Sequence, residues 1–74
     1  MYIVVEIKKD NGVLNVTTTS HANKAEARAK YYEILSEASK SGLEKHSASI
    51  LNEKGLSLQN EGFENPQEVT ENED

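Results

Sequence analysis

One stretch decides the fold, and it spans residues 23–41, NKAEARAKYYEILSEASKS. Its apolar residues recur at intervals of four, three and four, so they fall on one stripe of a 3.6-residue helix. They are Ala27, Tyr31, Ile34 and Ala38, with Leu35 widening the stripe on one side. A helix with a single apolar stripe needs a sheet to lie on, because that stripe has to be buried.

Both ends of this helix carry capping signals. Asn23 followed by Glu26 is a capping box, in which the Asn23 side chain accepts from the Glu26 amide and the carboxylate reaches back to the cap amide. Gly42 is expected to end the helix, because only glycine adopts the left-handed conformation there without strain. The sequence therefore predicts a helix between residues 23 and 42.

The segments before the helix predict a β-hairpin. Residues 2–8 and 13–19 are rich in β-branched and apolar residues, and residues 10–12 between them have the sequence DNG. Asn-Gly is the strongest short-range signal for a type I′ turn. With a two-residue loop Asp10 pairs with Val13, and this pair sets the register of the whole hairpin.

In this register the hairpin has two different faces. One is expected to lie under the helix, and it carries Ile3, Val5, Ile7, Leu14, Val16 and Thr18. The other is expected to be open to water, and it carries Tyr2, Val4, Val13 and Thr17. Tyr2 and Val4 are unusual there, because an open sheet face favours polar residues. We therefore expect these two residues to form the interface of a homo-oligomer, a dimer or higher, with an edge strand as the alternative interface.

The segments after the helix predict one or two further strands. Residues 46–51 favour a third strand, Gly55 marks a turn, and residues 56–60 favour a short fourth strand. Ala48 and Ile50 are expected to face the helix. A right-handed crossover through the helix places the third strand beside the first and parallel to it. The predicted fold class is α+β, in the order ββαβ or ββαββ, with the helix packed on one face of a small sheet.

Residues 61–74 differ in composition from the rest of the chain. They carry six of the thirteen acids and no base, which leaves seven acids and eight bases, a formal charge of +1, in residues 1–60. Such an acidic segment cannot bury enough apolar surface to offset its ordering entropy. We expect a compact domain over residues 1–60 and an acidic, flexible, disordered tail over residues 61–74. The near-neutral domain lacks the basic surface of a nucleic-acid-binding protein, so no direct nucleic-acid binding is expected.

Length and composition exclude several classes of protein. A chain of 74 residues, 35% of them hydrophobic and none of them Trp, is a single domain with a thin core. It has no Cys, which excludes disulfides and thiolate metal sites. The apolar run of residues 2–5 is too short for a signal peptide or a membrane span, so we expect a cytoplasmic protein with no membrane association.

Few residues have the spacing that catalysis or metal binding requires. His21 and His46 are the only histidines, and neither has further ligands at metal-binding spacing, so we expect ordinary surface or boundary residues and no metal. The chain has no Cys nucleophile and no Gly-x-Ser-x-Gly motif. Glu33 and Glu37 lie one turn apart on the polar face of the helix, where nothing shelters their carboxylates. We expect no enzymatic activity and no cofactor.

The start of the helix has the features of a ligand site. Its free amide groups and its dipole attract anions, and His21, Lys24 and Arg28 follow one another there. Tyr32 lies one turn beyond Arg28, where its ring is able to stack on a base or to anchor a protein partner. One interpretation is a site for a nucleotide-like anion. The other is that Asn23 caps the helix while the cations are solvated.

A resemblance to a known group of proteins rests on three segments: MYIVVEI at the start, ANKAEARAKYYEIL over the helix, and ASIL in the third strand. In these segments the chain resembles the small uncharacterised ββαβ proteins of phages and mobile elements in Gram-positive gut bacteria. The resemblance covers roughly residues 1–60 and carries over no catalytic residue. It implies a very small, non-enzymatic product that blocks a host component by binding. Some host-defence antagonists of that kind sequester nucleotide signals in pockets between subunits.

Two functions follow as expectations. The first is a non-enzymatic small binding protein, a phage or mobile-element inhibitor that acts by occupying a host partner protein. The alternative is an oligomeric sponge that sequesters a nucleotide-like anionic signal molecule near the helix N-terminus. The first binds a protein surface, whereas the second binds a small molecule through Lys24, Arg28 and Tyr32.

Overall fold

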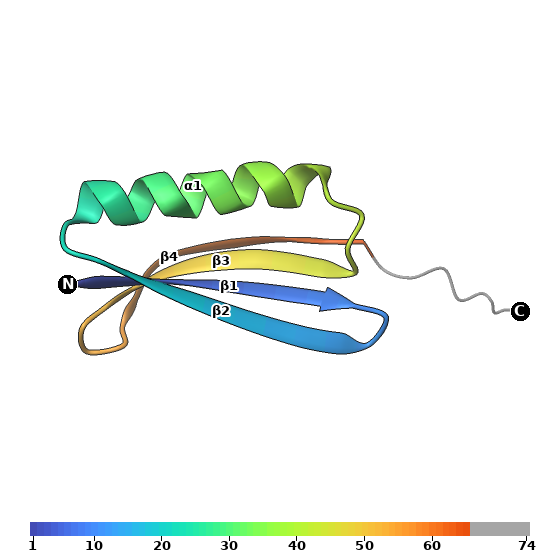
Figure 1. Cartoon of the computed structure of the whole chain (residues 1–74), viewed down its shortest axis with the longest axis horizontal. Coiled ribbons are helices and arrows are strands. Elements are labelled where there is room, and N and C mark those ends of the chain that lie inside the picture. The colour runs from blue at the N-terminus through green and yellow to red at the C-terminus, as the bar shows by residue number, and fades with distance from the viewer. Residues whose placement is uncertain (66–74) are drawn as a thin grey trace, which may run out of the picture.

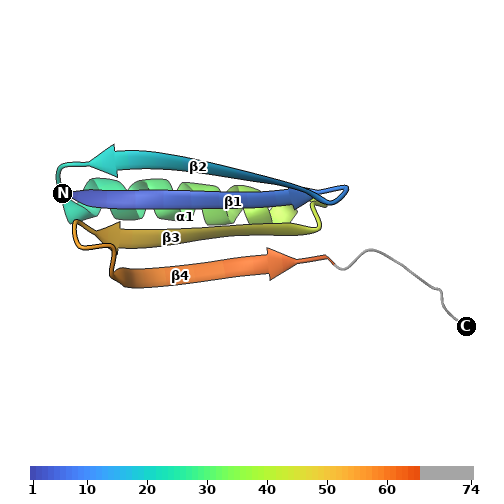
Figure 2. The ribbon, with the colours of Figure 1, turned by 90° about the horizontal axis from the view of Figure 1, so that it is seen from below.

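The computed structural model describes residues 1–65, which form an α+β fold (Figure 1). The elements in chain order are β1 (Tyr2–Asp10), β2 (Val13–His21), α1 (Lys24–Lys40), β3 (Lys45–Asn52) and β4 (Ser57–Glu64). The four strands form one antiparallel sheet in the order β2-β1-β3-β4. Figure 2 shows α1 behind the two central strands, with β2 and β4 at the edges. The predicted fold class is confirmed, in its ββαββ form.

The hairpin of β1 and β2 has the predicted turn and register. Asn11 and Gly12 have φ angles of 53° and 78°, as the two central residues of a type I′ turn require. Asp10 pairs with Val13 across the turn, and the pairing continues without a break to Tyr2 and His21. The turn residues therefore determine which residues face each other along the whole hairpin.

The predicted direction of the third strand is wrong. β3 does lie beside β1, but it runs antiparallel to it. The crossover through α1 connects β2 to β3 and makes those two strands parallel to each other. Because β1 lies between them and runs opposite to β2, it also runs opposite to β3.

The predicted assignment of the two sheet faces is also wrong. Val4 is 1% exposed and lies in the core beneath α1, and Tyr2 packs against the same core. Alternation along β1 puts Ile3, Val5 and Ile7 on the opposite face, which no helix of the described residues covers. The interface expected at Tyr2 and Val4 is therefore not on an open face.

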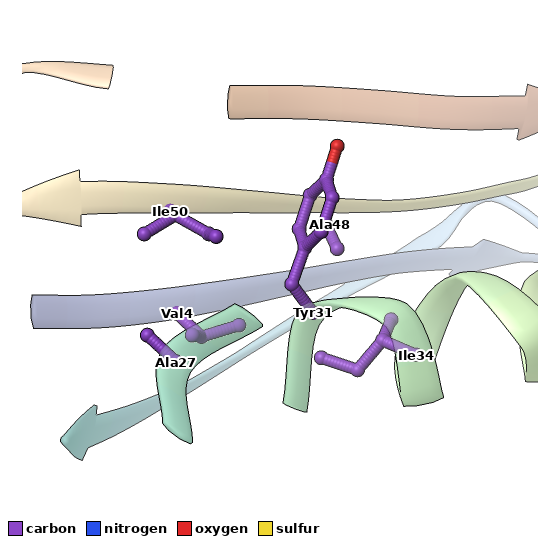
Figure 3. Close-up of a cluster of buried hydrophobic side chains, with 6 residues drawn as sticks. All are labelled: Val4, Ala27, Tyr31, Ile34, Ala48 and Ile50. Carbon is purple, nitrogen blue, oxygen red and sulfur yellow. The ribbon is translucent and has the colours of Figure 1, made fainter. Parts of the chain in front are cut away.

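The core is built from small residues where helix and sheet approach most closely (Figure 3). Its buried cluster consists of Val4, Ala27, Tyr31, Ile34, Ala48 and Ile50. Ala27 and Ala48 are 0% and 1% exposed, and their small side chains allow α1 to lie close to the sheet. Ala48 and Ile50 face the helix, as predicted. The apolar stripe of α1 is confirmed, with Leu35 packed at its margin.

The start of α1 follows the prediction, but its end does not. The Asn23 side chain accepts a hydrogen bond from the Glu26 amide at 2.9 Å. At the other end the chain leaves the helix at Ser41, which is extended, with φ −76° and ψ 151°. Gly42 does not have a positive φ, so the predicted left-handed cap is wrong. The Ser41 hydroxyl instead donates to the carbonyl of Ala38 in the last turn.

The fourth strand extends beyond the domain boundary predicted at Asn60. Residues 61–64 belong to β4, where Glu64 pairs with Lys45 in the register of the sheet. The Asn65 amide then donates to the Glu44 carbonyl at 2.9 Å, which ties the end of β4 to the start of β3. The start of the acidic segment is therefore part of the sheet, because β3 offers it a free edge. The rest of the predicted tail, residues 66–74, lies outside the described residues.

Candidate functional site

The face of the sheet opposite α1 carries an apolar patch, which we call the open face. Its larger side chains come from three adjacent strands: Ile3, Val5 and Ile7 of β1, Leu14 and Val16 of β2, and Leu51 of β3. Leu14 and Val16 are 59% and 56% exposed. An antiparallel sheet that faces water on one side normally carries polar residues there, so these aliphatic side chains are unexpected. Contiguous exposed apolar surface on a small protein marks an interaction site.

The open face is hollowed at its hairpin end. A cavity of about 580 Å³ lies there, with Ile7 and Leu14 on one side and Ser47, Gly62 and Phe63 among the other lining residues. Ser47 and Gly62 are paired in the register of β3 and β4, so two of the smallest side chains lie next to each other. The Lys45–Glu64 ion pair, at 3.9 Å, borders the same hollow. The result is an apolar depression with a charged rim.

Gly62 keeps this depression open because it has no side chain, and the close approach of β4 to β3 also requires a glycine there. A Cβ atom at position 62 would lie 2.7 Å from the Ser47 Cβ, a distance that requires one strand to move. We expect Gly62→Ala to lower the free energy of unfolding by about 1–3 kcal/mol, because overpacking forces side chains and backbone to shift. Urea unfolding followed by circular dichroism measures this loss.

The matched control for that substitution is Gly42→Ala. A Cβ atom at position 42 would meet no other atom within 4 Å, and Gly42 does not have a positive φ. The control variant should keep the wild-type stability within about 0.5 kcal/mol, as surface substitutions usually do. Equal losses in the two variants would mean that the contact with Ser47 is not the cause.

The residues predicted to bind an anion do not form a closed site. Lys24 and Arg28 are exposed on successive turns of α1, and Tyr32 is 54% exposed one turn further on. The Tyr32 hydroxyl points toward β4, where it accepts from the Gln59 side chain at 3.5 Å. His21 lies at the end of β2, at the other edge of the sheet, and its Nε2 is 2.9 Å from the Thr19 hydroxyl. Within residues 1–65, none of these four residues lines the hollow of the open face.

The two adjacent tyrosines of α1 have different environments. Their rings meet edge to face, with centroids 5.2 Å apart and an angle of 69° between the planes. Tyr31 is 3% exposed, and its hydroxyl points past Ala48 toward β4 (Figure 3). Burial, with the nearby Glu61 carboxylate and Tyr32, raises the pKa of Tyr31 above its ordinary value of 10.0. Tyr31 is thus a neutral core residue, and Tyr32 is the aromatic side chain that remains available at the surface.

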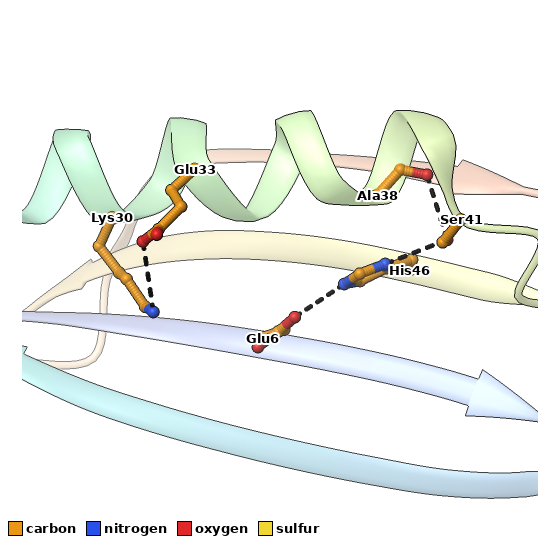
Figure 4. Close-up of polar contacts among 6 residues, drawn as sticks. All are labelled: Glu6, Lys30, Glu33, Ala38, Ser41 and His46. Atoms are coloured by element: carbon orange, nitrogen blue, oxygen red, sulfur yellow. Dashed lines mark hydrogen bonds and ion pairs between the residues drawn. The ribbon is translucent and has the colours of Figure 1, made fainter.

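A buried polar chain under the end of α1 is the feature that the sequence did not reveal (Figure 4). His46 is 4% exposed, so the expectation that it is a surface or boundary residue is wrong. Its Nε2 lies 2.7 Å from Glu6 Oε2, and its Nδ1 lies 3.2 Å from the Ser41 hydroxyl. The chain therefore connects β1, β3 and the end of α1 through three polar side chains. Burial of the histidine is tolerated because both ring nitrogens have partners.

The order serine, histidine and carboxylate occurs in hydrolases, but the geometry here favours a structural role. The Ser41 hydroxyl lies 3.2 Å from the Ala38 carbonyl as well as 3.2 Å from the His46 Nδ1, so the helix end competes with the imidazole for its proton. Ser41 also lies at the C-terminal end of α1, where the helix carbonyls give a negative potential. That potential opposes the oxyanion that acyl transfer at Ser41 would create. The polar chain instead fastens the helix end to the sheet.

The described residues carry few other features that indicate a function. Among residues 1–65, no group of three or more His, Asp or Glu side chains is placed to hold a metal ion. No helix in the described part of the chain is long and apolar enough to cross a membrane. Comparison of the chain with protein-family models, curated proteins and solved structures gives no match. The open face is therefore the candidate functional site on geometric grounds.

Proposed function

We propose that this chain is a small, non-enzymatic binding protein that acts by occupying a partner protein through its open face. The observation that supports the proposal is the aliphatic patch on a sheet face that no helix of the described residues covers. The resemblance to small phage and mobile-element proteins supports a host protein as the partner and inhibition as the outcome.

The open face suggests how a partner would be recognised. An apolar side chain of the partner enters the hollow between Leu14 and Gly62 and is removed from water there. The rim offers charged groups that select and orient the partner, because Lys45 and Glu64 pair there at 3.9 Å. Such a surface has the apolar centre and polar rim of protein interfaces.

Affinity capture tests this proposal with one face variant and one control. Wild type, Ile7→Lys and Ala29→Lys, each tagged at the C-terminus, are incubated with lysate of a Gram-positive gut bacterium. Ile7 lines the hollow, whereas Ala29 is exposed on α1, away from the sheet. A partner identified by mass spectrometry should be retained by wild type and Ala29→Lys. Its affinity, measured with the purified partner, should fall at least about tenfold in Ile7→Lys, because a charge in the hollow must be desolvated.

Two results would contradict the proposal. One is that no protein is retained by the wild type in preference to the tag alone. The other is that a retained protein binds Ile7→Lys as tightly as it binds the wild type. Circular dichroism of both variants should give the wild-type spectrum. A loss of binding is then due to the changed surface and not to unfolding.

The alternative proposal is an oligomeric sponge for a nucleotide-like anion. The observation in its favour is that Lys24, Arg28 and Tyr32 are all exposed on successive turns near the start of α1. Native mass spectrometry of the gently purified wild type, the same preparation used for capture, distinguishes the two. A retained nucleotide-sized molecule that is absent from Arg28→Ala supports the sponge.

A further inference from the structure

β2 is an edge strand without the features that normally protect an edge. Its nine residues include no charged residue and no proline. No backbone hydrogen bond from outside the sheet reaches it within residues 1–65. Natural proteins block long edge strands with charges, prolines, bulges or covering segments, because free backbone groups pair with other strands.

The hairpin register shows which backbone groups of β2 are free. In a two-residue hairpin the residues that flank the loop, here Asp10 and Val13, form a hydrogen-bonded pair. Every second residue of β2 from Val13 onward therefore directs its N–H and C=O toward β1. The intervening residues direct theirs to the outer side, and they are Leu14, Val16, Thr18 and Ser20.

The other edge of the sheet is different. β4 carries two acidic residues, Glu61 and Glu64, within its eight residues. Its pairing with β3 shifts register between Ile50 and Leu51, and such an irregularity twists a strand away from flat pairing. Like charges on two copies of β4 would oppose each other. Of the two edges, β2 is the one that has no charged residue and no register shift to oppose another strand.

We infer that two copies of this chain pair through their β2 strands, antiparallel and centred on Thr17, to form one continuous sheet. In this register Val16 lies opposite Thr18 of the second copy, and Leu14 lies opposite its Ser20. Each outward N–H and C=O of the four free residues then has a partner, and a shift in either direction leaves some of them unpaired. A second copy is the occupant because its own β2 supplies a strand that matches in length and outward groups.

The side chains of β2 allow this pairing, and the outer side of β2 is open to a second copy. The cross-strand pairs bring together aliphatic, hydroxyl and amide groups, with no charged residue on either strand. α1 lies behind the central strands (Figure 2), so it leaves the outer side of β2 uncovered. The two-fold axis passes perpendicular to the sheet, which puts both helices on one side and both open faces on the other.

Pairing through β2 also bears on the proposed function, because it enlarges the surface that a partner protein meets. The pairing itself requires no partner protein. A four-stranded sheet of this length presents a face of about 19 Å by 28 Å, on the order of 500 Å². Two copies joined at β2 place their open faces side by side and so double the flat area that one copy offers to a partner.

Sedimentation and amide exchange test the inference with the full chain. Sedimentation equilibrium at about 0.5 mM should give twice the chain mass of 8.2 kDa for wild type and for Thr18→Val, which keeps the backbone N–H. Thr18→Pro removes one outward donor and should give a monomer, because proline is tolerated on an edge strand but cannot extend the ladder. In wild type, the amides of the four outward residues should exchange slowly at this concentration and quickly after hundredfold dilution.

Clear results would overturn the inference. A wild type that stays monomeric at 0.5 mM, or fast exchange of the outward amides at that concentration, excludes β2 pairing even if Thr18→Pro fails to fold. A dimer that persists in folded Thr18→Pro requires another interface. Because Ile7→Lys changes the open face and not the edge, it should remain dimeric, so failure of partner capture and failure of pairing are distinguishable.

Discussion

Replacing Ile50 with alanine is expected to lower the free energy of unfolding by about 3 kcal/mol, the typical cost of truncating a buried Ile. Ile50 is 0% exposed and packs beneath α1 in the same cluster as Val4 and Tyr31 (Figure 3). The loss is large because the core is small, and a small domain has only about 5 kcal/mol of stability in total. Urea unfolding at fixed protein concentration measures the change.

The matched control is the next residue in the chain. Leu51→Ala removes a side chain of similar size from the open face, where Leu51 is only half-buried. We expect this variant to lose less than about 1 kcal/mol, because its side chain is already partly in water. If the two variants lost equal stability, or if Leu51→Ala lost more, α1 would not cover the face that carries Ile50.

The local parts of this fold could be predicted because each has its own sequence signal. The stripe and N-cap of α1 and the Asn11-Gly12 turn act over a few residues, and the structure confirms all three. The register of the hairpin follows directly from that turn. The direction of β3 could not be read in the same way, because it depends on β1 lying between the two strands that α1 connects.

The choice of sheet face failed for a different physical reason. Alternation identifies the buried face only when one of the two sets of residues is polar. In β1 both sets are apolar near the N-terminus, since Tyr2 and Val4 alternate with Ile3 and Val5. Glu6 belongs to the same set as Val4, and a charged residue is typical of an exposed face. In the structure the Glu6 carboxylate instead contacts the buried His46 beneath α1.

The interface expected at Tyr2 and Val4 accordingly falls on the face of the sheet that α1 covers. The sequence of β1 is apolar on both faces near its start, which indicates that an apolar surface is left open. The residues on that surface are Ile3, Val5 and Ile7 rather than Tyr2 and Val4. The hollow depends on Gly62 meeting Ser47, a pair set by a strand register that no local turn signal determines.

The second large effect is expected from breaking the buried contact between Glu6 and His46. Removal of one partner of a buried hydrogen bond typically costs about 1–3 kcal/mol, because the group left behind loses its partner away from water, and the cost rises when that group is charged. The Glu6 side chain is 19% exposed and the His46 side chain 5%, so little water reaches the carboxylate that loses its partner when His46 is replaced. We expect His46→Leu to lose about 3 kcal/mol, the upper end of that range, as measured by urea unfolding.

A double-mutant cycle separates the contact from the individual side chains. Glu6→Leu should also be destabilising, whereas Glu6→Leu combined with His46→Leu should lose clearly less than the sum of the two, because no unpartnered polar group remains under α1. Glu6→Gln is the conservative control, since its amide oxygen still accepts from Nε2 and it should lose less than Glu6→Leu. Strictly additive losses would mean that Glu6 and His46 stabilise the fold independently. In that case the 2.7 Å contact would not be what holds the end of α1 to the sheet.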